Sequence, residues 1–323
     1  MLKLGYKLMS EEDGPLDLVR NAVRAEKAGF DFAAISDHFF PWLEEQGHSP
    51  LAWSVLGAIA NATSRIGLMT AVTCPTMRYH PAIVAQGAAT VALLSNDRFT
   101  LGLGGGERLN EHIIGDGWPG RIERHEMLEE AIDIIQGLLA GELTNYRGQY
   151  LVLEHGKLFD RPERKPDVII AAGGPQAAQI AGEKGDGIIA TDADAELIKA
   201  YRKAGGNGPR YCEVGMCYAA REDEAREIAH TYFRWSLSGW PVMAELPDPE
   251  GFAAASKHVT PEDVAEQITC GPSGQKHLDA IDKYVKAGFD HIILTQIGPQ
   301  QEEFIRFFEQ ELAPALRGKK RAA

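Results

Sequence analysis

The sequence predicts an α/β fold, a (β/α)8 TIM barrel, and three observations lead to that prediction. Short apolar and β-branched runs alternate with helical patterns along almost the whole chain. Eight strand-like runs can be counted, and regular alternation builds right-handed βαβ units around a parallel sheet. A chain of 323 residues with 44% apolar side chains can form one large barrel of this type. We therefore expect a single domain that spans residues 1–323.

The expected strands are short apolar runs, in chain order residues 2–8, 32–36, 65–73, 99–104, 167–172, 187–191, 210–220 and 291–297. Helical patterns separate them, at residues 17–28, 51–62, 81–94, 124–139, 175–184, 195–204, 223–235, 261–267 and 278–287, and an amphipathic helix closes the chain at about residues 302–316.

Two stretches interrupt the strand–helix repeat. Residues 146–158, with Arg147-Gly148-Gln149 near the centre, predict an inserted β-hairpin. Residues 239–258 are rich in proline and small side chains and predict a long excursion after the seventh strand. Loops of that length are usually either functional lids or disordered.

Composition excludes several classes of partner. The formal net charge is −13, and the only basic run covers residues 317–321. We expect neither a nucleic acid nor a membrane as partner, because nucleic acids and anionic membranes both require a positive field. The chain begins with a strand-like run rather than a signal peptide, and no apolar run approaches membrane-spanning length. The four cysteines have neither zinc-site nor disulfide spacing, so we expect a cytoplasmic protein.

Polar or glycine-rich segments follow five of the expected strands, at the point where each strand ends. In chain order these segments are Asp37, His38 and Trp42; residues 73–76; residues 104–110; residues 172–176; and Thr191-Asp192. Active sites of TIM barrels are built at the carboxyl ends of the strands, so the segments should meet on one face. An isolated Asp-His pair is more often a strand cap with a packed histidine. The second polar cluster, around Glu107, favours a site.

Two glycine clusters predict different features. Gly104-Gly105-Gly106 resembles a dinucleotide fingerprint, but Glu107 replaces its third glycine and no helix is expected to begin directly at the turn. We interpret these glycines as backbone that a flat ring can approach, with a simple glycine-rich turn as the alternative. Gly173-Gly174 precede Pro175, a suitable first helical residue. Free amides at that helix start would favour an anion.

His38 and Glu107 are the candidate acid–base pair. Hydride transfer from an alcohol needs one group to take the hydroxyl proton and another to manage the proton of the cofactor. Trp42 either forms a wall of the substrate site and shields a cationic imidazole, or packs at the rim. The sequence contains no serine nucleophile elbow and no metal-binding motif, so we expect no metal.

Ordered motifs from Leu4 to about Thr191 resemble a known family. They are Leu4-Gly5-Tyr6-Lys7, Ser36-Asp37-His38-Phe39, Pro41-Trp42, Pro75-Thr76, Arg78-Tyr79, Pro81-Ala82, Gly106-Glu107, Leu109-Asn110-Glu111 and Ala171-Ala172-Gly173-Gly174-Pro175. The chain resembles the coenzyme F420-dependent glucose-6-phosphate dehydrogenase group, which lies within the luciferase-like TIM-barrel superfamily.

The resemblance implies that a deazaflavin, coenzyme F420, binds in the mouth of the barrel. The matching positions that would line it are Asp37, Cys74, Gly105, Gly106, Asn110, Gly173, Gly174, Gln176 and Ala177. Cys74 stands where family members often have threonine. Ala71-Val72 matches a non-prolyl cis peptide that lies against the deazaflavin ring. A homodimer is also implied.

The resemblance further assigns proton handling to His38 and Glu107, and places Trp42 beside the substrate. We assign Glu107 as base toward the substrate hydroxyl and His38 as proton donor, and the reverse assignment stays open. Both assignments predict an enzyme that acts on CH–OH donors.

The substrate is expected to differ from that of the family. Thr191 matches a substrate contact, but Asp194 stands where phosphate-binding members have a lysine. A carboxylate repels a phosphate dianion instead of pairing with it. The two other basic positions fall near Ala254 and Gln267, and Lys257 or Lys276 would have to compensate.

We therefore predict an F420-dependent oxidoreductase that acts on a sugar or other alcohol without phosphate specificity. One alternative is a genuine F420-dependent glucose-6-phosphate dehydrogenase. Another is a luciferase-like monooxygenase that uses FMN. A third is a non-catalytic protein that stores or delivers the deazaflavin, which an intact His38 and Glu107 disfavour.

Overall fold

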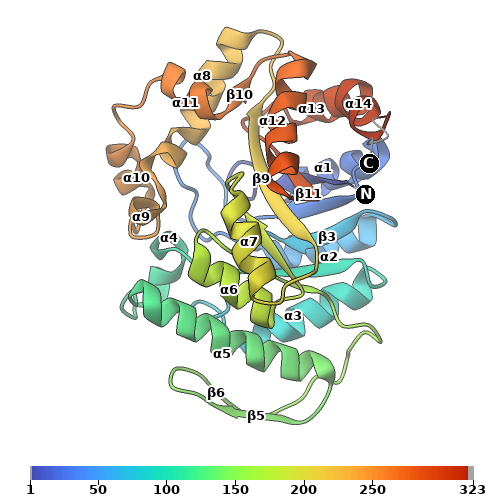
Figure 1. Ribbon diagram of the computed structural model, residues 1–323, viewed down its shortest axis with the longest axis vertical. Coiled ribbons are helices and arrows are strands. Elements are labelled where there is room, and N and C mark those ends of the chain that lie inside the picture. The colour runs from blue at the N-terminus through green and yellow to red at the C-terminus, as the bar shows by residue number, and fades with distance from the viewer. Residues whose placement is uncertain (1, 319–323) are drawn as a thin grey trace.

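Eight parallel strands close into a barrel in the computed structural model, which describes residues 2–318 (Figure 1). The barrel strands are β1 (Lys3–Leu8), β2 (Phe32–Ile35), β3 (Gly67–Thr70), β4 (Phe99–Leu103), β7 (Val168–Ala171), β8 (Gly187–Ala190), β9 (Arg210–Cys217) and β11 (His291–Gln296). β9 pairs with both β8 and β11, which closes the ring, and the two-residue strand β10 (Thr269–Cys270) pairs with the end of β9. The predicted (β/α)8 barrel is confirmed.

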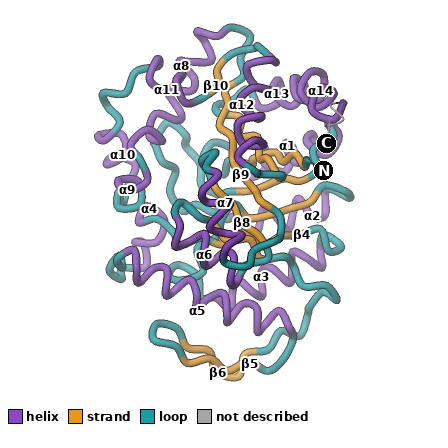
Figure 2. The backbone as a smooth tube through the Cα atoms, in the orientation of Figure 1, coloured by secondary structure: helices purple, strands orange, loops and turns teal. Residues whose placement is uncertain are grey.

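Helices surround the barrel, as Figure 2 shows by colour. Those that follow barrel strands are α1 (Pro15–Ala28), α2 (Ala52–Ala62), α3 (Pro81–Leu94), α5 (Arg121–Ala140), α6 (Pro175–Lys184), α7 (Ala195–Lys203), α8 (Glu222–Phe233) and α13 (Gln301–Phe307). Between β10 and β11 lies α12 (Gly274–Ala287), and a π-helical turn at Phe308–Leu312 leads into α14 (Ala313–Gly318).

The barrel strands are apolar on both faces because helices cover them outside and side chains fill them inside. Tyr6 and Leu8 of β1 face outward into the main core, whereas Lys7 between them points into the barrel. The Nζ atom of Lys7 donates to the Ala71 carbonyl oxygen at 2.8 Å and lies 2.7 Å from Glu213 Oε1. The buried charge is therefore paired.

Both predicted interruptions of the repeat are present. An antiparallel hairpin joins β5 (Thr144–Arg147) to β6 (Val152–Gly156). The excursion after β9 carries two short helices, α9 (Trp240–Met243) and α10 (Pro249–Ala255). Residues 261–267 form the expected helix α11 (Pro261–Gln267).

The third strand differs from its expected length, because β3 ends at Thr70. The Ala71–Val72 peptide bond that follows is cis, as the family resemblance implied. Thr73 then returns to a parallel bridge with Leu103 of β4.

The expectation that no helix begins directly after the glycine turn is wrong. A one-turn helix, α4 (Arg108–Glu111), starts immediately after Glu107, and a 3-10 turn follows at His112–Ile114. So short a helix has no sequence periodicity to reveal it and depends on tertiary contacts. One such contact joins the Arg108 N–H to the Ala244 carbonyl oxygen at 3.1 Å. A dinucleotide fingerprint remains excluded, because Glu107 still replaces its third glycine.

Candidate active site

His38, in the loop after β2, lies between two carboxylates. Its Nε2 atom is 3.4 Å from Glu107 Oε1 and 3.5 Å from Glu11 Oε1. Its Nδ1 atom is 3.0 Å from the Phe40 carbonyl oxygen, which can only accept, so Nδ1 carries a proton. Nε2 is therefore the nitrogen that faces the carboxylates.

Asn110 fixes Glu107 and the His38 loop relative to each other. Its Nδ2 atom donates to Glu107 Oε1 at 2.6 Å. Its Oδ1 atom accepts from the backbone N–H groups of Phe39 at 2.7 Å and Phe40 at 3.2 Å. One side chain thus connects the ends of β2 and β4, which are separated in the barrel by β3.

Glu11, after β1, is a site residue that the sequence interpretation missed. Its Oε1 atom accepts from the Trp42 indole N–H at 3.2 Å, and its Oε2 atom accepts from the Ser36 hydroxyl. Burial alone would raise the pKa of Glu11, but His38, Lys7 and Ser36 outweigh burial and lower the pKa. Glu11 is therefore a carboxylate at neutral pH. Applying the strand-end rule to the first strand, as well as to the later ones, would have found it.

Trp42 lines the site and also packs against the excursion. Its ring centroid lies 4.9 Å from that of His38. On its other side it stacks on Trp235 at 4.1 Å with an interplanar angle of 7°, and the edge of Phe252 approaches at 5.1 Å. The packing interpretation of Trp42 is confirmed, and its role beside the substrate stays a prediction.

A second buried network surrounds Asp37. Its carboxylate accepts from the Thr73 hydroxyl at 2.7 Å and lies 3.2 Å from Arg78 Nη2. Arg78 also contacts Glu111, whose Oε2 accepts the Arg78 backbone N–H at 2.8 Å. Burial raises the pKa of Glu111 to about 7, although Arg78 opposes the shift. Arg78 and Glu111 belong to the motifs that carry the family resemblance, but the sequence alone assigned neither residue a role.

The glycines at the barrel mouth leave open space. A Cβ atom added at Gly105, Gly173 or Gly174 would find no heavy atom within 4 Å. At Gly106 the φ angle is +73°, and a Cβ atom would lie 2.6 Å from the Sγ atom of buried Cys74. Gly174 directly precedes α6, with Pro175 in the first turn as predicted.

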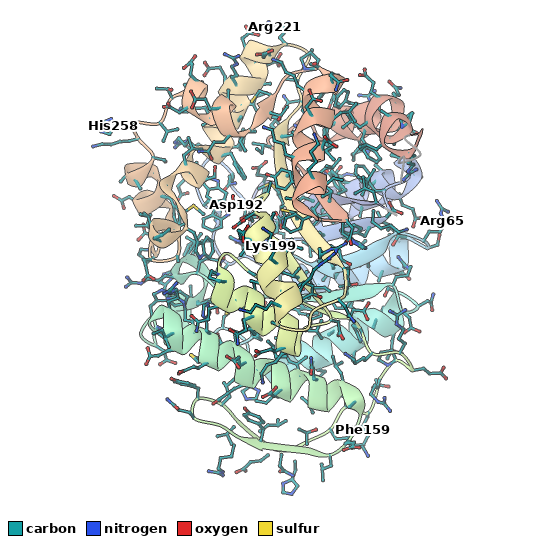
Figure 3. The ribbon with its side chains drawn as sticks, in the orientation of Figure 1. Arg65, Phe159, Asp192, Lys199, Arg221 and His258 are labelled. Carbon is teal, nitrogen blue, oxygen red and sulfur yellow. The ribbon has the colours of Figure 1, made fainter. Side chains whose placement is uncertain are left out.

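The remaining predicted site residues follow β7 and β8. Gln176 is exposed, whereas Ala177 is buried. Thr191 and Asp194 are exposed at the end of β8, next to Asp192, which Figure 3 labels. Asp194 caps α7, because its Oδ1 atom accepts the Glu196 N–H at 2.8 Å. All predicted site residues therefore lie beyond the carboxyl ends of their strands or at the helices that follow.

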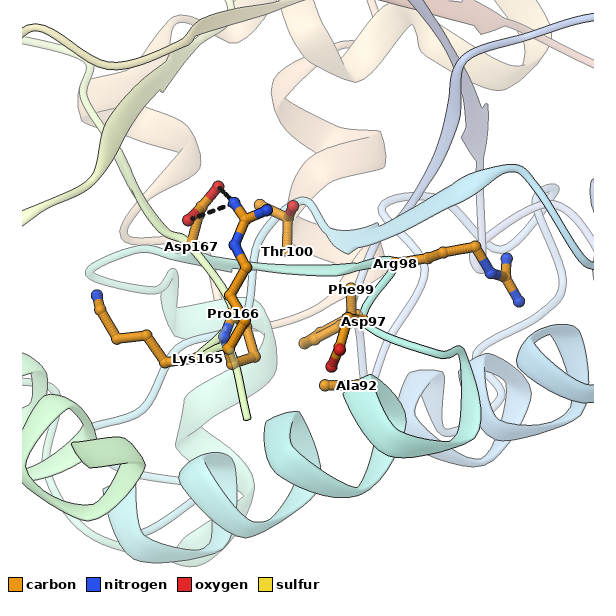
Figure 4. Close-up of a pocket in the computed structure, with 9 residues that line it drawn as sticks. Ala92, Asp97, Arg98, Phe99, Thr100, Lys165, Pro166 and Asp167 are labelled. Atoms are coloured by element: carbon orange, nitrogen blue, oxygen red, sulfur yellow. Dashed lines mark hydrogen bonds and ion pairs between the residues drawn. The ribbon is translucent and has the colours of Figure 1, made fainter. Parts of the chain in front are cut away.

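A separate hollow lies at the other end of the barrel. It has a volume of about 210 Å³ and is lined mainly by residues just before or at the start of β4 and β7 (Figure 4). Asp167, on its edge, pairs with Arg164 at 3.2 Å. Catalytic residues of TIM barrels lie at the opposite end, and neither His38 nor Glu107 lines the hollow. Within residues 2–318, no group of His, Cys, Asp and Glu side chains is arranged to hold a metal, and no helix could cross a membrane.

A closed (β/α)8 barrel with ionisable side chains gathered at the carboxyl ends of its strands defines a TIM-barrel enzyme. The sequence model of the luciferase-like monooxygenase family matches residues 3–291, and the chain belongs to that family.

Individual relatives carry more specific names than the family as a whole. An F420-dependent glucose-6-phosphate dehydrogenase from Amycolatopsis mediterranei is 37% identical over 98% of this chain and 99% of the relative. One from Microbacterium testaceum is 36% identical over 98% of each. A solved F420-dependent secondary alcohol dehydrogenase, in complex with an F420-acetone adduct, superposes with a TM-score of 0.89 at 27% identity and covers 96% of this chain and 98% of its own. The predicted family relationship is confirmed.

Proposed function

We propose that this protein is a coenzyme F420-dependent oxidoreductase that transfers a hydride between an alcohol and the deazaflavin. The observation that carries the proposal is His38 Nε2, held between Glu107 and Glu11 beside an open, glycine-flanked barrel mouth. The named F420-dependent dehydrogenases that the chain resembles support the same chemistry.

The chain's residues fit such a coenzyme. Open space at Gly105, Gly173 and Gly174 leaves room for a flat ring and for an anionic group at the start of α6. We assign the remaining contacts to Asp37, Ala71, Val72, Cys74, Gly106, Asn110, Gln176 and Ala177. When bound, the deazaflavin supplies the hydride acceptor.

The side chains then handle the protons. Oxidation removes a hydride from the alcohol carbon and a proton from its hydroxyl group, which leaves a carbonyl compound. We assign Glu107 as the base that takes the hydroxyl proton. His38 Nε2, 3.4 Å from Glu107 and 3.5 Å from Glu11, would donate the proton that the deazaflavin takes up together with the hydride. Trp42 flanks the substrate, and no metal is needed.

The alcohol is unphosphorylated in this proposal. Asp194 brings negative charge where the family resemblance implies a lysine, and we keep Thr191 as a substrate contact. Lys276 does not compensate, because its Nζ atom pairs with Glu222 at 2.7 Å. Ala254 and Gln267 are uncharged, and Lys257 lies on the exposed end of the excursion. Genuine glucose-6-phosphate dehydrogenase activity is the second candidate, because curated relatives carry that name.

Cofactor titration tests the proposal against an FMN-dependent monooxygenase, because the family description names a luciferase-like monooxygenase. The protein should bind oxidised F420 with a Kd at least about tenfold below those for FMN and NADP+, a difference of about 1.4 kcal/mol. Equal or tighter binding of FMN would overturn the deazaflavin assignment. F420 binding without turnover of any alcohol would instead support the storage protein.

A homodimer is proposed from the surface of α2 and α3. Neither helix contains a charged residue, although 24% of the chain is charged. Ile83 and Leu94 of α3 are nonetheless 57% and 52% exposed. An exposed apolar face of this kind fits a two-fold contact with a second copy. Light scattering at micromolar concentration should give twice the mass of one chain. The Ile83→Glu variant should instead give the mass of a single chain.

We also propose that residues 1–323 form one domain and that the protein is cytoplasmic. The four cysteines are free and buried, which suits a reducing compartment. A small-molecule alcohol is the proposed partner, rather than a nucleic acid or a membrane.

A further inference from the structure

We infer that Arg78 is a positioning residue for His38, and that it acts by holding the peptide group that joins Asp37 to His38. The inference rests on the proposed dehydrogenase function, in which His38 donates a proton. Arg78 lies in the segment between β3 and α3, and its guanidinium reaches the loop that follows β2. The imidazole is therefore positioned through its own backbone.

The backbone on both sides of His38 is held by a side chain. Before His38, the Nη2 atom of Arg78 donates to the Asp37 carbonyl oxygen at 2.8 Å, and this carbonyl belongs to the peptide group that leads into His38. After His38, the next two backbone N–H groups donate to Asn110 Oδ1 at 2.7 and 3.2 Å. Loss of the first anchor would release the carbonyl group nearest to the imidazole.

Both anchors lead to the short helix α4. Asn110 and Glu111 are consecutive residues of this helix, which begins directly after Glu107. Glu111 Oε2 accepts the Arg78 backbone N–H at 2.8 Å, and Glu111 Oε1 lies 3.5 Å from Arg78 Nε. Glu111 also packs against the glycine turn, because a Cβ atom added at Gly106 would lie 3.1 Å from Glu111 Cγ. Arg78 therefore connects the loop after β2 with the turn that carries Glu107.

Burial makes the geometry of the guanidinium demanding. The side chains of Arg78, Asp37 and Glu111 are 8%, 0% and 1% exposed, so one buried cation serves two buried carboxylates. The guanidinium carbon lies 4.6 Å from the centroid of the Tyr79 ring, which supports its flat face. A planar fork can donate to a carbonyl and face two carboxylates at once, whereas an ammonium group is a point charge. Arg78→Lys therefore keeps the charge and removes the geometry.

The first test measures turnover of the F420-loaded enzyme. The probe alcohol is glucose or 2-propanol, whichever the native enzyme oxidises faster. Arg78→Lys should lower kcat at least about tenfold, because a displacement of about 1 Å costs up to about 100-fold. In the His38→Ala background, the same substitution should change kcat by less than about twofold, since no imidazole remains to be positioned. This loss of effect distinguishes a positioning residue from one that only stabilises the fold.

The second test measures the loop itself, without coenzyme or alcohol. Hydrogen–deuterium exchange of the amides in residues 36–42 should be at least about fivefold faster in Arg78→Lys than in the native protein. Arg98→Lys is the matched control, because Arg98 also donates to backbone carbonyl oxygens, at 3.1 Å to Ala60 and 3.0 Å to Thr63, at the other end of the barrel. Arg98→Lys should leave kcat and the exchange of residues 36–42 within about twofold of the native values.

Glu111→Gln tests the same connection without changing Arg78. Glutamine can still accept the Arg78 backbone N–H, but it removes the charge that faces Arg78 Nε, so kcat should fall at least about threefold. That fall should disappear in the His38→Ala background. This variant carries the kinetic test if Arg78→Lys does not fold.

The outcomes separate this inference from the proposed function. Absence of F420 binding and of alcohol oxidation in the native protein would overturn the dehydrogenase assignment, and loop exchange in Arg78→Lys would still show whether Arg78 holds the backbone of His38. With an active native enzyme, kcat within about twofold of native in both variants would overturn the positioning role alone. So would native loop exchange in Arg78→Lys, an undiminished effect in the His38→Ala background, or equal effects of Arg78→Lys and Arg98→Lys.

Discussion

His38 and Glu107 provide the most direct test of the proposed chemistry. General acid–base groups contribute about 100- to 10,000-fold to turnover. We expect His38→Ala and Glu107→Gln each to lower kcat by at least about 100-fold, with F420 affinity changed by less than about threefold. Stopped-flow hydride transfer and F420 titration separate the two quantities. Near-wild-type turnover in both variants would refute the assigned roles.

Asp194 allows a sharper test of phosphate selection. Asp194→Lys should raise kcat/KM for glucose-6-phosphate relative to glucose by about tenfold, since a charge-assisted contact contributes about 1.5–3 kcal/mol. The substitution also removes the cap of α7, which should cost about 1 kcal/mol of stability.

Asp194→Asn is the matched control, because asparagine can still cap the helix but adds no positive charge. It should retain stability and improve glucose-6-phosphate use less than Asp194→Lys. If the native enzyme already prefers glucose-6-phosphate with a micromolar KM, the unphosphorylated substrate is excluded, and Lys257 becomes the residue to examine.

Residue-level prediction from sequence was good where a polar side chain follows an apolar strand. His38 and Glu107 were paired in this way, and the structure brings them within 3.4 Å. Glu11 also follows an apolar strand, but it was missed because the strand-end rule was not applied to the first strand; its contacts with Trp42 and Ser36 become visible only in the fold. The second role of Asp194, as a helix cap, likewise depends on where α7 begins.

At the scale of elements, the excursion is held in place by its aromatic contacts with Trp42. Phe252 of α10 is completely buried. Phe252→Ala should therefore lower the free energy of unfolding by about 3–5 kcal/mol, or unfold the excursion locally. Urea denaturation measures the free energy of unfolding, and limited proteolysis within residues 239–258 detects local unfolding of the excursion. Phe159→Ala is the exposed control, with an expected change within about 0.5 kcal/mol. Equal stability of the two variants would show that the excursion does not depend on this packing.

The barrel strands and long helices were predicted because their periodicity is encoded locally. α4, β10 and the early end of β3 were not, because each is set by partners distant in sequence. The hydrogen bond from Arg108 to Ala244, across the excursion, is one example.

For the whole molecule, titration of buried acids predicts how stability depends on pH. Burial raises the pKa of Glu12 to about 8, of Asp13 to about 6 and of Glu111 to about 7. These groups hold protons in the folded state that the unfolded chain releases at lower pH, so the free energy of unfolding falls as pH rises from about 4 to 8.

Two groups oppose this trend at low pH. The pKa of Asp290 is about 2, since His291 and Arg210 outweigh burial, and the pKa of Glu11 is also lowered. Their stabilisation is present above the unfolded pKa of about 4 and is lost as pH falls further. Urea midpoints should therefore be highest near pH 4 and decrease through pH 7 and 8.5. A midpoint that rises over this range would contradict the assigned burial of Glu12 and Glu111.

The carboxamide of Asn110 has a consequence for how the enzyme meets its ligands. It joins the loop that carries His38 to the strand end that carries Glu107 through hydrogen bonds that involve only groups of the chain itself. His38 and Glu107, the proposed acid–base pair, are thus preorganised, and no binding energy is consumed in bringing them together. Neither ligand has to arrive first for the pair to form, so a random order of addition is compatible with this site.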